Sequence, residues 1–300
     1  MSRKLSQLTE IPGDVATGVR LLRQEGYGRF VDELSDYLVH IEKRREKRRI
    51  RENYQDDPKY LNVGGGQFVR DHWRVLDYPK DHYDYDDLFI DFEIDLEETE
   101  TQWPMADNSY DLIYSSATLE HISSQAVDHS LEEAYRILKP GGGIHITVPD
   151  ADLLLNIYEN RDTEWIEKVA EVQPGGNDYM HCPLGYEPEF YVMVRIATAL
   201  TLRTVDAGLD FDVVRSDYET MEKEEFLNKY TSMVREEWQQ KIGGHRNWFN
   251  HDKLKRLLTR AGFTDVERTY ARQSRYAELC VEGFDPRPQW SVHVDAGKPE

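Results

Sequence analysis

The stretch YLNVGGG at residues 60–66 decides the fold, because a short apolar run ends directly in three glycines. Such a run is typical of a buried strand, and glycine at its end lets the backbone approach a ligand closely. In an open α/β sheet, the ligand crevice lies beyond the carboxyl ends of the strands. Taken alone, three glycines are equally compatible with a tight turn that binds nothing, so the flanking sequence has to decide.

The next apolar run, residues 74–76, ends at Asp77. Its carboxylate is expected beside the glycine turn, where it can accept hydrogen bonds from a ribose diol. Only eleven positions separate Gly66 from Asp77, so we expect the intervening helix to have one or two turns at most. A nicotinamide fingerprint is disfavoured, because Val69 stands where its third glycine belongs and its acid comes about 20 residues later.

Beyond residue 60, short apolar runs alternate with helical patterns, which is typical of βαβ units on a parallel sheet. The seven expected strands are 60–63, 74–76, 89–91, 110–114, 143–148, 264–270 and 290–294. Helices are expected at 126–138 and 250–261. The first of them should stop at Lys139-Pro140-Gly141-Gly142-Gly143, because proline and three glycines cannot continue it. The fold class is therefore α/β, with a mostly parallel seven-stranded sheet flanked by helices.

Two longer stretches carry a family resemblance. They are WPMADNSYDLIYSSATLEHI at residues 103–122, which follows Asp95-Leu96, and EAYRILKPGGG at residues 133–143, which leads into Val148-Pro149-Asp150. In this order and spacing after the glycines, they resemble class I S-adenosylmethionine-dependent methyltransferases. The resemblance covers about residues 60–155 and implies a Rossmann-like sheet that binds S-adenosyl-L-methionine as cofactor.

The resemblance implies a cofactor site at the ends of the first four strands. Its residues are Asn62, Gly64, Gly65, Gly66, Asp77, Asp95, Leu96, Ser115 and Ser116. The glycines match the loop against the methionine part, and Asp77 matches the acid that holds the ribose. Asp95 and Leu96 match the residues that border the adenine, and the two serines lie near the reactive methyl. Asn62 departs from the family, since most relatives have an acidic residue there.

A catalytic base is needed only where the acceptor must lose a proton. His121, in the Leu-Glu-His signature, is the candidate for this base, because an imidazole titrates near neutrality. The alternative is that His121 packs or caps a helix. His145 is expected to be a core residue, and Asp150 either borders the site or caps the next helix. Residues of the later segments that are able to line an acceptor pocket are His181, Tyr186, His245 and His251. No metal is expected, because His181-Cys182 has no second ligand pair at metal-binding spacing.

Four parts of the chain are expected. They are an N-terminal helical extension at 1–55, a cofactor-binding half at 56–150, a largely helical inserted cap at 151–245 that selects the acceptor, and a C-terminal part of the same domain at 246–300. The basic block at 43–49 is more often a solvated helix face than a docking surface, although docking of a partner stays open.

Composition limits the partners. With 57 acidic and 37 basic side chains, the net charge is -20, which disfavours nucleic acid and anionic membranes. Two cysteines and no long apolar stretch indicate a cytoplasmic protein without membrane insertion. We therefore expect methyl transfer to an oxygen or nitrogen atom of a small molecule, with a sugar-like acceptor as one option. A non-catalytic binding or scaffold protein of the same fold is the alternative, and the oligomeric state is not indicated.

Overall fold

A computed structural model describes residues 58–66, 68–79, 89–162, 210–234 and 244–300, together with 45, 49–50, 164, 193 and 195–197. The chain divides into two compact units, Met1–Gln55 and Asp56–Glu300, and the sheet belongs to the second. The N-terminal helical extension expected at 1–55, and the basic block within it, lie almost wholly outside the described residues. No helix in the described part is both long and apolar enough to cross a membrane.

The second unit is built on a seven-stranded sheet with the order β3-β2-β1-β4-β5-β7-β6. Its strands are β1 (Tyr60–Val63), β2 (Trp73–Asp77), β3 (Phe92–Glu93), β4 (Tyr110–Ser116), β5 (Leu138–Pro149), β6 (Thr264–Thr269) and β7 (Ser291–Gly297). Every neighbouring pair from β3 to β5 is parallel, whereas β7 runs antiparallel to both β5 and β6. The strand order reverses between β1 and β4, which places a ligand crevice at their carboxyl ends.

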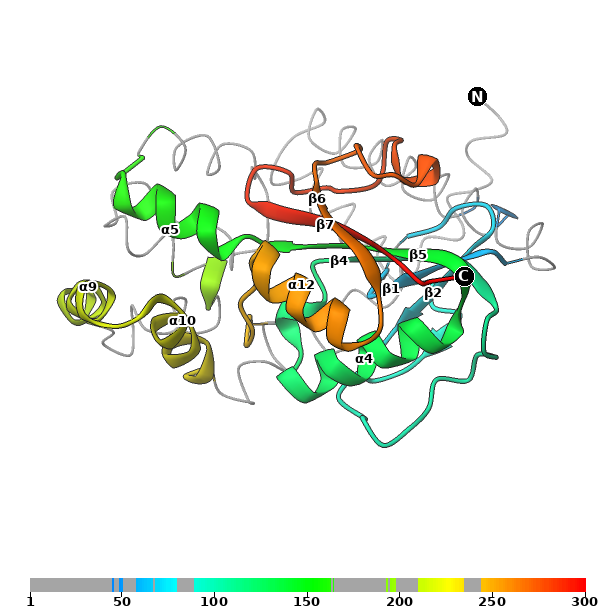
Figure 1. Ribbon diagram of the computed structural model, residues 1–300, viewed down its shortest axis with the longest axis horizontal. Helices are drawn as coiled ribbons and strands as arrows, with labels where there is room; N and C mark the ends of the chain where they lie inside the picture. The colour runs from blue at the N-terminus through cyan, green and yellow to red at the C-terminus, as the bar shows by residue number, and fades with distance from the viewer. Residues whose placement is uncertain are drawn as a thin grey trace, which may run out of the picture. The chain divides into compact units, whose positions relative to one another are not determined.

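Two helices cover one face of this sheet (Figure 1). They are α4 (Ser124–Ile137) and α12 (His251–Arg260), and each begins with a side-chain cap, from Ser123 and Asn250 respectively. Their apolar stripes pack on alternate residues of the strands, and together they form the main core. Alternation along β1 and β4 sends the intervening side chains to the other face.

Segments near the C-terminal strands cover the opposite face around β1, β2 and β4. The described residues between Gly64 and His72 form turns without a helix, so the one- or two-turn helix expected there is absent from them. Phe284 instead packs against Phe68, Trp73 and Tyr114, with ring centroids 5.4, 5.3 and 4.9 Å away. Leu279, from the short helix η4 (Ala277–Leu279), completes this aromatic cluster.

The third strand lies three residues later than the sequence indicates, at Phe92–Glu93 rather than 89–91. The carboxylate of Asp91 explains the difference. Its Oδ2 accepts the backbone N–H of Val75 at 2.9 Å, in place of the carbonyl oxygen that a strand would present. Regular pairing therefore starts only at Phe92, opposite Leu76.

The fifth strand begins at Leu138, directly after α4, and not at Gly143. The helix does end before the Lys-Pro-Gly-Gly sequence, but these four residues form the first part of the strand, which contains a bulge. The register between β4 and β5 shifts between Tyr110 and Leu112, and Gly141 takes φ +77°. A residue that follows β7 stabilises the bulge, because Gly141 N–H donates to the carbonyl of Lys298 at 3.0 Å.

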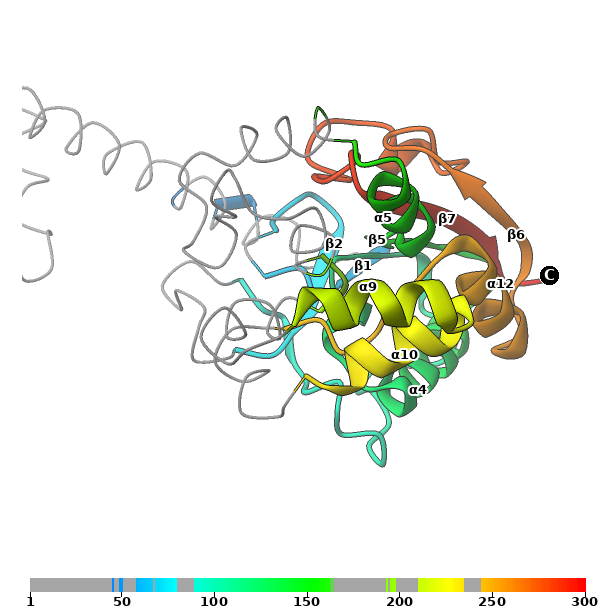
Figure 2. The ribbon, with the colours of Figure 1, turned by 90° about the vertical axis from the view of Figure 1, so that its left-hand side faces the viewer.

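The described part of the inserted cap is helical. It contains α5 (Ala151–Glu159), α9 (Phe211–Thr220) and α10 (Lys223–Ser232), and Figure 2 shows the last two lying side by side. These helices bury their own apolar cluster, which includes Leu154, Phe226, Trp248 and Trp290. Since both tryptophans belong to the segments that follow the cap, this cluster fixes the cap to the sheet domain.

Candidate functional site

The glycine turn after β1 is shaped by packing as well as by space for a ligand. Gly64 has φ +75°, and a Cβ atom there would lie 2.0 Å from Oγ1 of Thr118. That hydroxyl donates to the carbonyl of Val63 at 3.2 Å, which holds the loop after β4 against the turn. Glycine is therefore required at position 64 for two reasons, a left-handed backbone and the close approach of Thr118.

Asp77 lies beside the glycine turn, as its place at the end of β2 predicts. Gly66 N–H donates to its Oδ2 at 2.7 Å, and Tyr78 N–H donates to its Oδ1 at 2.7 Å. The arrangement orients the carboxylate at the edge where strands β1 and β2 end.

The remaining predicted cofactor residues occupy the ends of β3 and β4. Asp95 follows β3 by two residues, and its Oδ1 accepts the N–H of Glu97 at 3.0 Å. The side chain of Leu96 is buried in the main core, so only its backbone is available to a ligand. Ser115 is 4% exposed, and its hydroxyl has no hydrogen-bond partner among the described residues. Together with Ser116, it ends β4 next to the glycine turn, because Ser115 is in register with Val63.

Three side chains with oxygen or nitrogen atoms able to bind a metal lie close together near the end of β4. Glu120 and His121 come from η3 (Leu119–His121), directly after the strand, and His245 comes from the segment that precedes α12. The rings of His121 and His245 are 4.8 Å apart at 75°, and His121 Nε2 lies 4.0 Å from Glu120 Oε1. One donor atom from each residue lies within 4.8 Å of the other two. The candidate base His121 thus has two titratable neighbours.

Burial shifts the protonation of this group. Glu120 is 1% exposed, and burial raises its pKa to about 7, although the charge of Arg287 opposes the rise. Desolvation lowers the pKa of His245 well below its ordinary value, and the charges of His121 and two arginines act in the same direction. Near neutral pH, therefore, His245 is neutral and Glu120 is present in both its protonated and its charged form.

Glu120 is a site residue that the sequence did not single out, and His245 was expected only as a residue able to line an acceptor pocket. The Leu-Glu-His signature drew attention to His121, but the burial of Glu120 depends on a segment far away in the chain. Arg246 N–H and Asn247 N–H both donate to the carbonyl of Glu120, at 2.8 and 3.1 Å. No local sequence pattern predicts this contact.

Other candidates from the sequence fall elsewhere. Asp150 caps α5, accepting the N–H of Asp152 at 3.1 Å, and it pairs with Arg268 at 2.7 Å. His251 is the first residue of α12 and lies 3.4 Å from Asp252. His181 and Tyr186 lie outside the described residues.

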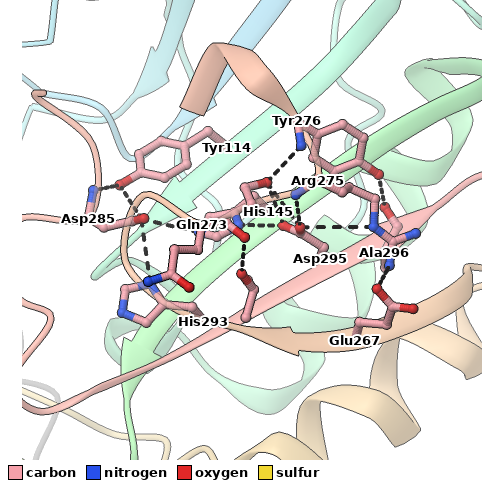
Figure 3. Close-up of polar contacts among 12 residues, drawn as sticks. Tyr114, His145, Glu267, Gln273, Arg275, Tyr276, Asp285, His293, Asp295 and Ala296 are labelled. Carbon is pink, nitrogen blue, oxygen red and sulfur yellow. Dashed lines mark hydrogen bonds and ion pairs between the residues drawn. The ribbon is translucent and has the colours of Figure 1, made fainter. Parts of the chain in front are cut away.

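A second histidine cluster lies between β5 and β7 (Figure 3). His145 is fully buried, as expected for a core residue, and its ring nitrogens lie 2.6 Å from Asp295 Oδ1 and 3.1 Å from Asp285 Oδ1. Burial disfavours the charged ring, yet the two carboxylates raise the pKa of His145 to about 8. Both carboxylates also accept backbone N–H groups, from Arg272 and Arg275. The cluster joins residues 272–285 to the sheet.

A family model described as a methyltransferase domain matches residues 20–268. No curated protein matches the chain in sequence.

Among solved structures, a SAM-dependent methyltransferase from Archaeoglobus fulgidus is 14% identical, with 87% of this chain and 99% of that chain covered and a TM-score of 0.38. Human N-acetylserotonin methyltransferase in complex with SAM is 16% identical (81% and 48% covered, TM-score 0.35). Phosphoethanolamine N-methyltransferase 2 of Haemonchus contortus is 12% identical (85% and 53% covered, TM-score 0.37). The chain thus spans only about half the length of the latter two.

Proposed function

Since the chain belongs to the methyltransferase-domain family, which takes its methyl group from S-adenosylmethionine, we propose that it methylates an oxygen or nitrogen atom of a small molecule. The single observation that carries this proposal is the bond from Gly66 N–H to Asp77 Oδ2 at 2.7 Å. It joins the glycine turn and the acid that the family uses for the methionine part and the ribose of the cofactor.

The residues present fit that cofactor. Its ribose needs an acceptor of two hydrogen bonds beside the glycine turn, which Asp77 supplies. The buried hydroxyl of Ser115, with no partner among the described residues, is the kind of polar atom that a ligand satisfies. When bound, S-adenosylmethionine supplies an electrophilic methyl group on a sulfonium ion.

The chain's own residues then have separate tasks. The backbone of Gly64–Gly66 holds the methionine part, Asp77 orients the ribose, and Asp95 with the backbone of Leu96 borders the adenine. Methyl transfer depends mainly on holding the acceptor atom in line with the methyl carbon at about 3 Å and on excluding water. We assign the choice of acceptor to the inserted cap.

An acceptor hydroxyl must also lose its proton. His121 is the group we assign to this step, because it follows β4 directly and its side chain is 30% exposed, open enough to meet an acceptor. An amine acceptor that is already neutral needs no such base.

We also place the protein in the cytoplasm, on the grounds of its two cysteines and the exposed thiol of Cys280.

The test is titration of S-adenosylhomocysteine, by calorimetry, into the wild type and into Asp77→Ala and Asp77→Asn. We expect saturable binding to the wild type and at least a tenfold loss in both variants, since a lost charge-assisted hydrogen bond costs about 1.5–3 kcal/mol. Asn retains an acceptor for Gly66 N–H, so it separates lost binding from lost folding. Glu132→Ala, which removes the same charge from the exposed face of α4, is the matched control. A wild type that does not bind refutes the proposal.

A second candidate is a non-catalytic protein that retains the fold. The absence of a helix among the described residues of the β1–β2 crossover favours it, because the glycine turn then lacks a helix N-terminus behind it. Release of S-adenosylhomocysteine in the presence of any acceptor would eliminate this candidate.

A further inference from the structure

We propose that Glu120, His121 and His245 bind a divalent transition-metal ion of the zinc type. The first ground is geometric. One donor atom from each of the three side chains lies within 4.8 Å of the other two. Ligands of a tetrahedral ion at about 2.1 Å are about 3.4 Å apart, so small side-chain rotations close the group around an ion.

The second ground is the carboxylate of Glu120. Its side chain is 1% exposed, and Oε2 has no hydrogen-bond partner among the described residues. An unsatisfied buried carboxylate oxygen is costly, and it persists only where something compensates it. A cation between this oxygen and the two imidazoles provides that compensation.

The third ground is the orientation of His245. Its Nδ1 lies 2.6 Å from the backbone carbonyl of Arg195, and a carbonyl oxygen only accepts, so Nδ1 carries the hydrogen. In the neutral ring Nε2 then has the lone pair, which is the tautomer a metal requires. A carbonyl behind the ligating imidazole is the usual second contact of a metal-binding histidine.

The fourth ground is rigidity. The carbonyl of Glu120 accepts two backbone N–H groups, from Arg246 and Asn247. The amide of Asn247 donates in turn to the carbonyl of Ile122 and accepts from the hydroxyl of Ser124. The segments that carry the three ligands are therefore held together before an ion arrives, as a binding site requires.

The ligand set selects the metal. Two imidazoles and one carboxylate favour Zn²⁺, Co²⁺, Mn²⁺ or Fe²⁺, whereas Mg²⁺ and Ca²⁺ prefer oxygen ligands throughout. Three protein ligands leave coordination positions open, which is typical of catalytic and not of structural zinc sites. The sequence did not suggest this site, because its two parts are separated by the entire inserted cap.

The ion would assist methyl transfer by activating the acceptor. This role rests on the proposed function. The group follows β4, on the side where the acceptor is expected. A cation there lowers the pKa of an acceptor hydroxyl, whose proton passes to solvent. Its oxygen then forms the bond to the methyl carbon while the carbon–sulfur bond breaks toward sulfur. His121 is in that case a metal ligand, and the hydroxyl needs no side-chain base.

The rival occupant of the carboxylate is Arg287, whose charge acts on both Glu120 and His245. An arginine that pairs permanently with Glu120 would neutralise it without a metal. The two possibilities differ in the number of ions that the purified protein binds.

The test is titration of Co²⁺ and Zn²⁺ into untagged, chelator-treated protein without S-adenosylhomocysteine, followed by visible absorption and calorimetry. We expect one ion per chain, and at least a tenfold weaker binding in Glu120→Gln and in His245→Gln. His129→Gln, which alters a histidine of α4 whose ring contacts the carbonyl of Thr101, should bind as the wild type does. Zinc should also raise the melting temperature of the wild type but not of the two ligand variants.

Absence of binding in the wild type, or equal binding in all variants, would overturn the proposal in favour of Arg287. Cofactor titration in the presence of chelator is a separate experiment. The metal site and the methyltransferase function can therefore fail independently of each other.

Discussion

Replacing His145 with glutamine should destabilise the protein by an amount that depends on pH. The ring carries a charge between Asp285 and Asp295, both buried. Glutamine removes this charge and leaves two carboxylates without it, and breaking a buried ion pair in this way costs about 3–5 kcal/mol. For a unit of this size, the melting temperature falls by about 2–4 °C per kcal/mol.

The pH dependence follows from the direction of the pKa shift. The pKa of His145 is raised from 6.5 to about 8 on folding, which corresponds to about 2 kcal/mol. This stabilisation is fully present below about pH 6.5 and is lost as the pH rises through about 8. The difference between wild type and variant should therefore shrink by about 2 kcal/mol between about pH 6 and about pH 9.

Urea unfolding at the two pH values measures this difference, and subtracting the variant removes the general pH response of an acidic protein. His129→Gln is again the control, since it changes a half-buried ring on α4 that lies outside this cluster. A difference between wild type and His145→Gln that is the same at both pH values would show that the buried ring is not charged, and the reasoning would be wrong.

Three further variants probe other parts of the structure by thermal and urea unfolding. Gly64→Ala should lose about 1–3 kcal/mol, from left-handed backbone strain and the clash with Thr118, and Thr118→Gly should restore only the part due to the clash. Arg136→Lys should lose about 1–3 kcal/mol, because the guanidinium donates to Glu133, Asp107 and two backbone carbonyls, and an ammonium cannot reach them all. Phe284→Ala should lose about 3–5 kcal/mol by emptying the aromatic cluster. A loss below about 0.5 kcal/mol in any of the three would contradict the packing described for it.

The sequence predicted the fold where local signals and tertiary pairing agree. The strand at 60–63 is confirmed without change, and the seven-stranded sheet is confirmed as mostly parallel. The third strand was misplaced because the Asp91 carboxylate takes the place of a backbone acceptor. The glycines at 141 and 142 were expected to follow the end of the helix and precede the fifth strand, but a bulge paired with Lys298 accommodates them within that strand.

The candidate site was predictable only in part. Asp77 was expected beside the glycine turn because the ends of neighbouring parallel strands meet, and the bond to Gly66 agrees with that expectation. The burial of Glu120 was not predictable, because it is produced by backbone groups of residues 246–247 that return from beyond the inserted cap. Contacts of this kind have no periodicity in the sequence.

Because Phe284 packs where a crossover helix would otherwise lie, this part of the sheet cannot be covered until late in the synthesis of the chain. Strands β1, β2 and β4 are complete once residue 116 has been added, but Phe284 and Asp285, which pack against Tyr114, follow much later. Asp285 is 171 positions beyond Tyr114, which at about 5–20 residues per second is a delay of roughly 10–30 s. During that interval, Trp73 and Tyr114 present bare aromatic surface to the cell. The nascent chain should therefore be a chaperone client until residue 285 has left the ribosome, and slow codons between positions 116 and 285 should lower the yield of folded protein.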